Sequence, residues 1–418
     1  MLPRTQEQSA LLSQHAAELL SGSVSYLTPD SGALTGSSGE MDFDGDGTPE
    51  IISCLMRDGN PSVEIYRQTE KKPEFLARIT GRGSGIDALY FPRLQADGTI
   101  GIVVSWKLDG SSLKGLTICA WYDGRFETLF SGAAQEILTA DLDRDGSEEI
   151  LYLTKDTSEN WQAVMLRYHS GGLYSSDPVM LSQGLQPQRV SVENIGFDRS
   201  ALLCEGVVEP YGMITDVIVT TEGQLKNLYY SEFTGVSDLT ARTLPLFCAD
   251  VNNDGTVELP RTRTVTELSE SGDETETLLI DWYRCDEFSE PIDLYTTYHN
   301  WEEGWFFRLP DRMRYSVLPV PGVAAEEISS TLFYFLDGEG QRGKALWEIY
   351  VLSGEDAEST VEFCALRTLA AAEGKLYAMR HHGTVSGFYT RNSLPQYFSL
   401  IDQADLAEVF PNYSTTLS

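Results

Sequence analysis

The stretch DFDGDGTPEII, residues 42–52, places four acidic side chains within nine positions and then runs directly into an apolar segment. It recurs in the same register as DLDRDGSEEIL from Asp141 and as DVNNDGTVELP from Asp250. Every copy has an acid or amide at positions 1, 3 and 5, glycine at position 6 and glutamate at position 9. A motif that returns three times in one register predicts a repeat architecture.

Each gap between these copies holds a degenerate unit. The copies start 99 and 109 residues apart (141 − 42 and 250 − 141), about twice the length of a propeller blade. RLQADGTIGIVVSW, from Arg93, keeps the Asp-Gly-Thr of the loop but lacks its acids at positions 1, 3 and 9. ENIGFDRSALLCEGVV, from Glu193, keeps the strand without a usable loop. The first residue after each loop then marks five units, spaced 51, 48, 51 and 58 residues apart: Ile51, Ile102, Ile150, Ala201 and Leu259.

The units read as antiparallel meanders. CAWYDGRFETLF, MLRYHSGGLYSS and VIVTTEGQLKNLYY each have the pattern of a strand, a glycine turn and a second strand. Meanders of about this length without intervening helices are typical of propeller blades, and stacking them side by side covers their faces and edges. We therefore expect a mainly β fold, a β-propeller with about five recognisable blades of roughly 50 residues.

The two ends of the chain fall outside this pattern. Residues 1–24 carry leucine and alanine on one helical face, which predicts an amphipathic N-terminal helix. Residues 25–315 form the predicted propeller. After it, VLPVPGVAAEE has the composition of a linker, and the segment 316–418 contains several further strand patterns. This segment is either a C-terminal β-rich or α+β domain or a divergent blade that closes the ring.

Composition narrows the classes of partner. The chain has 418 residues and a net charge of −33, from 63 acidic and 30 basic side chains, which repels nucleic acid and anionic lipid. No apolar stretch has the length of a transmembrane segment, and the first residues lack the layout of a signal peptide. Six dispersed cysteines without a CxxC pair exclude a zinc site. Buried free thiols are the favoured interpretation, and disulfides remain open.

The acidic loops themselves indicate a cation. Closely spaced carboxylates repel one another unless they are fully solvated or share a metal ion. Three copies in one register favour the metal. Calcium accepts six to eight oxygen ligands in flexible geometry, and the glycine at position 6 lets the backbone turn sharply around it. An EF-hand is excluded, because position 12 is Ser53, Tyr152 or Arg261 where an EF-hand needs an acid, and the flanking segments are strand-like.

This nine-residue, strand-flanked form resembles the calcium loops of the integrin α-subunit type of β-propeller, the FG-GAP or VCBS repeat family. The resemblance covers roughly residues 25–315 and implies a bacterial surface or lipoprotein-like member. It further implies up to three Ca²⁺ sites, with side chains at positions 1, 3, 5 and 9 and the carbonyl of position 7 as ligands. Carried over, the ligands are Asp42, Asp44, Asp46, Thr48 and Glu50; Asp141, Asp143, Asp145, Ser147 and Glu149; and Asp250, Asn252, Asp254, Thr256 and Glu258. Asn252 replaces an acid, so we expect the third site to be the weakest.

The expected function is a non-enzymatic, calcium-binding interaction module. Weak calcium sites suit proteins outside the cell, so we expect an extracellular or cell-surface location and an unidentified protein or glycan ligand. The alternatives are a calcium-assisted polysaccharide lyase or hydrolase on a propeller scaffold and a structural module of an envelope assembly. The five histidines form no catalytic pattern, and GEGQRG (338–343) lies between two strand patterns, which favours a hairpin turn. Trp301 and Trp305 could contact a sugar or pack in the core.

Overall fold

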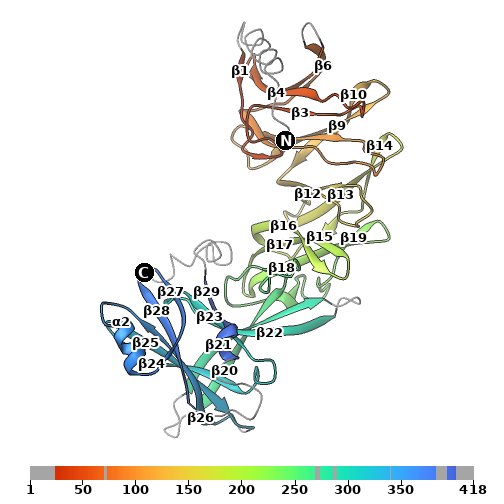
Figure 1. The fold of residues 1–418 in the computed structure, drawn as a ribbon. Helices are drawn as coiled ribbons and strands as arrows, with labels where there is room; N and C mark the ends of the chain where they lie inside the picture. Colours follow the sequence, from red (N-terminus) through yellow and green to blue (C-terminus); the bar gives the residue numbers. More distant parts are fainter. Residues whose placement is uncertain are drawn as a thin grey trace. The chain divides into compact units, whose positions relative to one another are not determined.

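The computed structural model describes residues 24–69, 73–268, 274–285, 290–338, 340–382 and 393–401 (Figure 1). The predicted mainly β class is confirmed, because these residues form six sheets and one α-helix. No closed ring of blades is seen among them. The predicted N-terminal helix falls on residues that lie outside the described part of the chain. The five unit anchors identified in the sequence lie in five different sheets.

The chain divides into two compact units. The first comprises residues 1–194, 198–208 and 215–238, and the second comprises 195–197, 209–214 and 239–418. When the six sheets are numbered along the chain, sheets 1 to 3 belong to the first unit, sheets 5 and 6 belong to the second, and sheet 4 contributes residues to both.

Sheets 1 to 4 follow one another along the chain (Figure 1). Sheet 1 has the order β1-β4-β5-β6 with β3 beside β4, sheet 2 the order β10-β9-β8-β7-β2, sheet 3 the order β11-β12-β13-β14 with β15 beside β13, and sheet 4 the order β16-β17-β18-β19. Their strands are β1 (Val24–Tyr26), β2 (Ser31–Gly32), β3 (Ser38–Met41), β4 (Glu50–Arg57), β5 (Asn60–Arg67), β6 (Glu74–Thr80), β7 (Gly85–Tyr90), β8 (Gly101–Lys107), β9 (Lys114–Tyr122), β10 (Arg125–Ala134), β11 (Glu136–Ala140), β12 (Glu149–Lys155), β13 (Trp161–His169), β14 (Gly172–Ser175), β15 (Val179–Met180), β16 (Gln186–Gly196), β17 (Arg199–Val208), β18 (Gly212–Thr221) and β19 (Gln224–Asn227).

Tight turns join the strands where the sequence predicts them. The predicted meanders correspond to β9–β10, β13–β14 and β18–β19. Their turns are Asp123-Gly124, Ser170-Gly171 and Glu222-Gly223, and both residues of each turn have positive φ. That backbone twist matches the twist of paired strands, which is why such two-residue turns favour glycine. ENIGFDRSALLCEGVV is likewise a hairpin, with β16 and β17 joined at Phe197 and Asp198, so no loop is present there.

Sheet 2 is apolar on both faces. Alternate residues of β8 belong to different cores: Ile102, Val104 and Trp106 pack in a cluster with residues of sheet 1, whereas Val103 packs in a cluster with residues of sheet 3. Because successive strand side chains point to opposite faces, this alternation places sheet 2 between its two neighbours. The strands that follow the first two acidic loops, β4 and β12, are largely buried in this stack. Five of the six cysteines are buried and all six are free thiols, which confirms the favoured interpretation.

Sheets 5 and 6 form most of the second unit. Sheet 5 has the order β20-β21-β22-β23-β29, and sheet 6 the order β24-β25-β26-β28-β27. Because β29 pairs with β23, residues from both sides of position 315 share one sheet. The elements are β20 (Leu259–Leu268), β21 (Glu274–Cys285), β22 (Pro291–Asn300), β23 (Trp305–Leu309), β24 (Val317–Ala325), β25 (Ile328–Leu336), β26 (Arg342–Leu352), α2 (Ala357–Phe363), β27 (Arg367–Ala372), β28 (Lys375–His381), β29 (Phe398–Leu400) and the 3-10 turns η1 (Asp238–Thr240) and η2 (Leu394–Tyr397).

The prediction that VLPVPGVAAEE is a linker is wrong, because most of this segment forms strand β24. Proline is tolerated there since β24 is the edge strand of sheet 6, where a missing N–H interrupts no ladder. The register with β25 shifts between Pro321 and Ala324, which accommodates the second proline as an irregularity. GEGQRG lies between the end of β25 at Leu336 and the first residues of β26, its antiparallel partner, so its interpretation as a hairpin turn is confirmed.

Candidate metal centre

Each acidic loop joins two antiparallel neighbours. Loop 42–50 runs from β3 into β4, and loop 141–149 runs from β11 into β12. Loop 250–258 lies between Ala249 and the start of β20, and Ala249 and Glu258 form an antiparallel bridge across it. The strand-flanked geometry expected from the sequence is therefore observed at loops 42–50 and 141–149, whereas loop 250–258 has a strand after it and a single bridge residue before it.

The loops share one backbone path. The residues at positions 4 and 6 have positive φ in every copy. The glycine at position 6 therefore sits in a conformation that other residues rarely adopt. Its N–H donates to the Oδ2 of the aspartate at position 1, at 2.9 Å in the first loop, 3.0 Å in the second and 2.7 Å in the third. The carboxylate at position 1 thus closes each loop on itself.

The glutamate at position 9 is buried in all three loops. Glu50, Glu149 and Glu258 are each at most 2% exposed. The Oε2 of each accepts a hydrogen bond from the backbone N–H at position 2, where the residue is apolar. These donors are Phe43 at 3.0 Å, Leu142 at 2.9 Å and Val251 at 3.0 Å. The apolar residue at position 2 therefore anchors the loop, and its N–H orients the glutamate.

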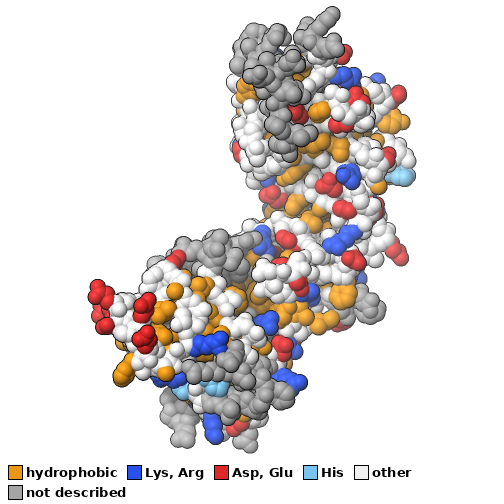
Figure 2. Space-filling model, viewed as in Figure 1, with side chains coloured by type: hydrophobic (Ala, Val, Ile, Leu, Met, Phe, Trp, Pro, Cys, Tyr) orange, Lys and Arg blue, Asp and Glu red, His pale blue; other side chains and the backbone are white. Residues whose placement is uncertain are grey.

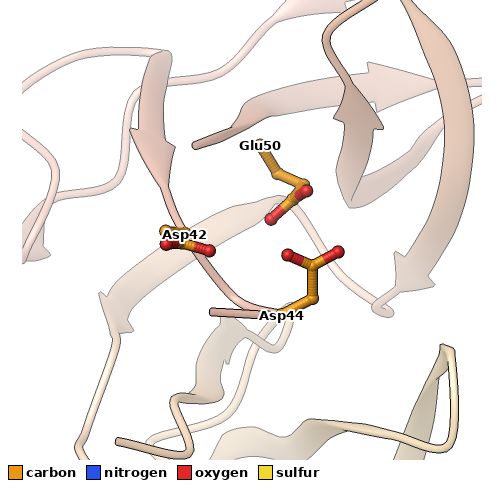
Figure 3. A group of neighbouring side chains, drawn as sticks. All are labelled: Asp42, Asp44 and Glu50. Carbon is orange, nitrogen blue, oxygen red and sulfur yellow. The ribbon is translucent and has the colours of Figure 1, made fainter. Parts of the chain in front are cut away.

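Two of the loops gather an acidic triad that can hold a metal ion. Asp42, Asp44 and Glu50 each offer an oxygen, and these oxygens lie within 4.8 Å of one another; Asp141, Asp143 and Glu149 do the same. Figure 3 shows the three carboxylates of the first triad facing a common space. Calcium–oxygen distances of about 2.3–2.6 Å place ligands on opposite sides of one ion up to about 5 Å apart, so the spacing fits. An all-oxygen donor set suits a hard cation.

Burial and mutual repulsion disfavour the charged form of the position 9 glutamates. Burial raises the pKa of Glu149 to about 7, and the charges of Asp145 and Asp141 raise it further, although the N–H of Leu142 opposes them. Burial is also the largest cause of the raised pKa of Glu50 and of Glu258. A cation among these oxygens would favour the ionised glutamate, because it lowers the pKa of each carboxyl that contacts it.

The structure does not bring all the predicted ligands together. The carboxyls at position 5, Asp46 and Asp145, are not part of either triad, and each instead accepts the N–H of position 7. In the described part of the chain the third loop forms no comparable triad. There Asn252 donates its Nδ2 to Asp254 Oδ2 at 2.9 Å and also contacts the Tyr295 hydroxyl. An amide donor therefore faces the carboxylate where the other loops offer an aspartate.

Each loop also has an arginine that was not predicted from the sequence. Arg67, Arg167 and Arg284 lie on the next strand and contact the loop carboxylates. They follow the position 9 glutamate by 17, 18 and 26 residues (67 − 50, 167 − 149 and 284 − 258). The spacing varies because the hairpins differ in length, so no fixed motif marks these residues. Aligning the two strands of each hairpin would have found them.

Other features named in the sequence have different roles. Trp305 is fully buried in the core of the second unit, so core packing, the second of its two readings, is observed. Trp301 stacks on His299 with ring centroids 4.3 Å apart. Among the described residues, no helix has the length and apolarity needed to cross a membrane. On the face drawn in Figure 2, acidic and basic side chains are interspersed, with acidic side chains gathered over α2.

No family model and no curated protein matches the chain. Several solved structures are similar to part of it, among them the following two. One is a protein from Lactobacillus plantarum, with 8% identity, a TM-score of 0.27 and an alignment covering 77% of this chain and 93% of that one. The other is Sqt1 from Saccharomyces cerevisiae, with 10% identity, a TM-score of 0.30 and coverage of 70% and 92%. Similarity at this level identifies neither a family nor a function.

Proposed function

We propose that the protein is a calcium-binding β-repeat protein of the integrin α-subunit, FG-GAP or VCBS type, a propeller whose ions stabilise the sheets. The two acidic triads carry this proposal, since the same three loop positions converge at both sites. Loops 42–50 and 141–149 are the stronger sites. Loop 250–258 is the weakest, because Asn252 removes one charge and presents an amide donor.

Calcium then links each loop to the strand that follows it. The position 1 and position 3 ligands precede β4 or β12, and the position 9 ligand is the first residue of that strand. An ion between them fixes the loop in the conformation of the folded state. At millimolar calcium, a site with Kd of about 10 to 100 μM stabilises the fold by about 1.4 to 2.7 kcal/mol. Such weak sites are filled outside cells, which supports an extracellular or cell-surface location.

The test is thermal melting of the full chain in calcium, in magnesium and in chelator, together with calorimetric titration. We expect calcium to raise the melting temperature and magnesium to raise it less. Asp141→Asn removes a ligand and should remove one site. Asp97→Asn is the matched control. Asp97 lies in the degenerate loop, where position 9 is the uncharged Gly101, so this substitution should remove no calcium site. A melting temperature that is the same in calcium and in chelator would refute the proposal.

We further propose that the protein presents a protein- or glycan-binding surface. A cavity of about 450 Å³ in the first unit supports this role. It is lined by Trp161 together with Glu136, Arg189 and neighbouring residues of β16. An aromatic ring beside charged and amide groups is the combination that binds sugar faces and hydroxyls. A glycan and surface-protein screen with the wild-type chain and Trp161→Ala tests it; equal binding by both, or none, would contradict a role for this cavity.

A further inference from the structure

The same strand register places an arginine opposite the position 9 glutamate in all three loops. Ile51 pairs with Tyr66, Ile150 with Leu166 and Leu259 with Tyr283. One step further along each antiparallel pair, Arg67 faces Glu50, Arg167 faces Glu149 and Arg284 faces Glu258. Three different hairpins thus deliver a guanidinium to one structural position.

Each guanidinium contacts carboxylate oxygens of its loop. Arg67 Nη2 lies 2.7 Å from Asp44 Oδ2, and its Nε lies 3.8 Å from Glu50 Oε1. Arg167 pairs with Asp143, and its Nε lies 3.3 Å from Glu149 Oε1. In these two loops the arginine therefore holds positions 3 and 9, two of the three members of each acidic triad.

The third arginine is arranged differently. Arg284 Nη2 lies 2.8 Å from Glu258 Oε1, and its second partner is Asp254 at position 5. Position 3 is Asn252 there, which has no charge to offer a guanidinium. Arg284 therefore contacts the position 9 glutamate, as the other two arginines do, but its second carboxylate partner is at position 5 and not at position 3.

The degenerate loop supplies an internal comparison. In the stretch from Arg93, position 9 is Gly101, and the residue opposite it on β9 is Ala120. The acid and the arginine are therefore absent together. Leu94, at position 2, remains buried, so the loop has kept its anchor in the core while losing both charges. The arginine accompanies the acidic loop and is not a general feature of the hairpins.

We propose that Arg67, Arg167 and Arg284 are built-in cations that compete with calcium for the loop carboxylates and so set the calcium affinity of each loop. This inference rests on the proposed calcium function. A buried glutamate needs a charged partner whether or not an ion is bound. Calcium must approach the same oxygens to about 2.3–2.6 Å, and a guanidinium in direct contact with them repels a divalent ion. Binding therefore requires the arginine to turn away from position 3.

The experiment is a calorimetric titration of calcium into the full, chelator-stripped chain. Asp42→Asn is included in every variant, so that loop 141–149 is the stronger remaining site. In this background we expect Arg167→Gln to tighten calcium binding at least tenfold, which is about 1.4 kcal/mol. Arg167→Lys should tighten it less, because the charge remains but the bidentate contact is lost. Arg125→Gln is the control, since Arg125 pairs with Glu127 on an exposed strand outside the loops.

Melting in chelator gives a second measurement that does not depend on calcium affinity. Without an ion, Arg167→Gln leaves Glu149 and Asp143 without their cation, so its melting temperature should fall well below that of Arg125→Gln. Added calcium should then raise the melting temperature of Arg167→Gln by more than it raises that of the parent protein. Together these results would show that one cation substitutes for the other.

The outcomes separate this inference from the proposed function. If the parent protein binds calcium and Arg167→Gln binds it equally or more weakly, the arginine supports the site and the competition is overturned. If the parent does not bind calcium but Arg167→Gln does, the competition is supported in its strongest form. If neither the wild-type chain nor any variant binds calcium, the proposed function fails and the inference fails with it.

Discussion

At the residue scale, the buried polar groups divide into those with complete hydrogen-bond sets and those without. Asp216 is fully buried in the first unit and accepts hydrogen bonds from the N–H and Oγ of Ser182, from Asn227 Nδ2 and from Ser237 Oγ. Burial nevertheless raises the pKa of Asp216. Four donors from three segments converge on this one side chain, so Asp216 holds these segments together.

Removing the Asp216 carboxylate should destabilise the first unit. Asp216→Ala leaves several buried donors without an acceptor, and each such group costs about 1 to 3 kcal/mol. We expect a loss of at least about 3 kcal/mol and, for a unit of this size, a fall of about 6 to 12 °C in its melting temperature. Asp109→Ala, at an exposed turn, should change the melting temperature little. A similar small effect at both positions would show that the network does not stabilise the unit.

His299 represents the opposite case. Its ring stacks between Trp301 and Phe306, its Nε2 lies 2.9 Å from Thr297 Oγ1, and its Nδ1 is buried without a hydrogen-bond partner in the described structure. Burial lowers the pKa of His299 to about 3, because the charged imidazolium would be desolvated. The unfolded chain, with an ordinary histidine pKa of about 6.5, therefore takes up the proton more readily than the folded chain.

This shift predicts acid sensitivity in the second unit. The contribution of neutral His299 to stability is complete above about pH 6.5 and decreases as the pH falls toward 3, with about 2 kcal/mol lost by pH 5. Melting temperatures at pH 7 and pH 5 test it. His299→Gln should show a smaller fall than the wild type, whereas His169→Gln, at the exposed end of β13, should behave like the wild type. Equal falls in wild type and His299→Gln would contradict the assignment.

At the element scale, β2 links the first two sheets. The chain leaves sheet 1 after β1, pairs in parallel with β7 of sheet 2 through β2, and returns to sheet 1 as β3. Gly32 makes this approach possible: its φ is +99°, and a Cβ built there would lie 2.2 Å from the carbonyl oxygen of Leu89. A larger residue at this position would have to displace backbone.

Gly32→Ala should therefore separate β2 from β7. We expect a loss of about 1 to 3 kcal/mol from backbone strain, together with faster amide exchange at Ala33, whose N–H donates to Leu89 O at 2.7 Å. Gly36→Ala is the matched control, because a Cβ at Gly36 meets no atom within 4 Å. Unchanged exchange at Ala33 in Gly32→Ala would show that the strand pair tolerates the methyl group.

The same scale explains what the sequence could and could not predict. Strand-turn-strand units are local patterns, so the glycine turns between strand patterns identified them. The linker prediction at 317–327 failed because proline content was read without knowing that β24 is an edge strand. The arginines opposite position 9 escaped because cross-strand pairing depends on hairpin length, which differs among the three loops. The loop glycine at position 6 was predicted because its conformation is a property of one residue.

At the scale of the whole molecule, the two acidic triads both lie in the first unit, and loop 250–258 lies in the second. The third loop has fewer negative charges, and its arginine holds the position 9 glutamate by a 2.8 Å contact. If calcium stabilises the unit that it contacts, it should raise the stability of the first unit more than that of the second. This asymmetry can be measured on the full chain.

Scanning calorimetry of the full chain tests the division. Two compact units with separate cores should give two transitions, and calcium should raise mainly the one that belongs to the first unit. The assignment follows from Asp216→Ala, which should lower that same transition, and from His299→Gln, which should change the pH dependence of the other. Asp42→Asn combined with Asp141→Asn should abolish most of the calcium shift, whereas Glu258→Gln should leave it nearly intact. A calcium shift confined to the transition that responds to His299→Gln would place the functional ion at the third loop and contradict the ranking of the sites.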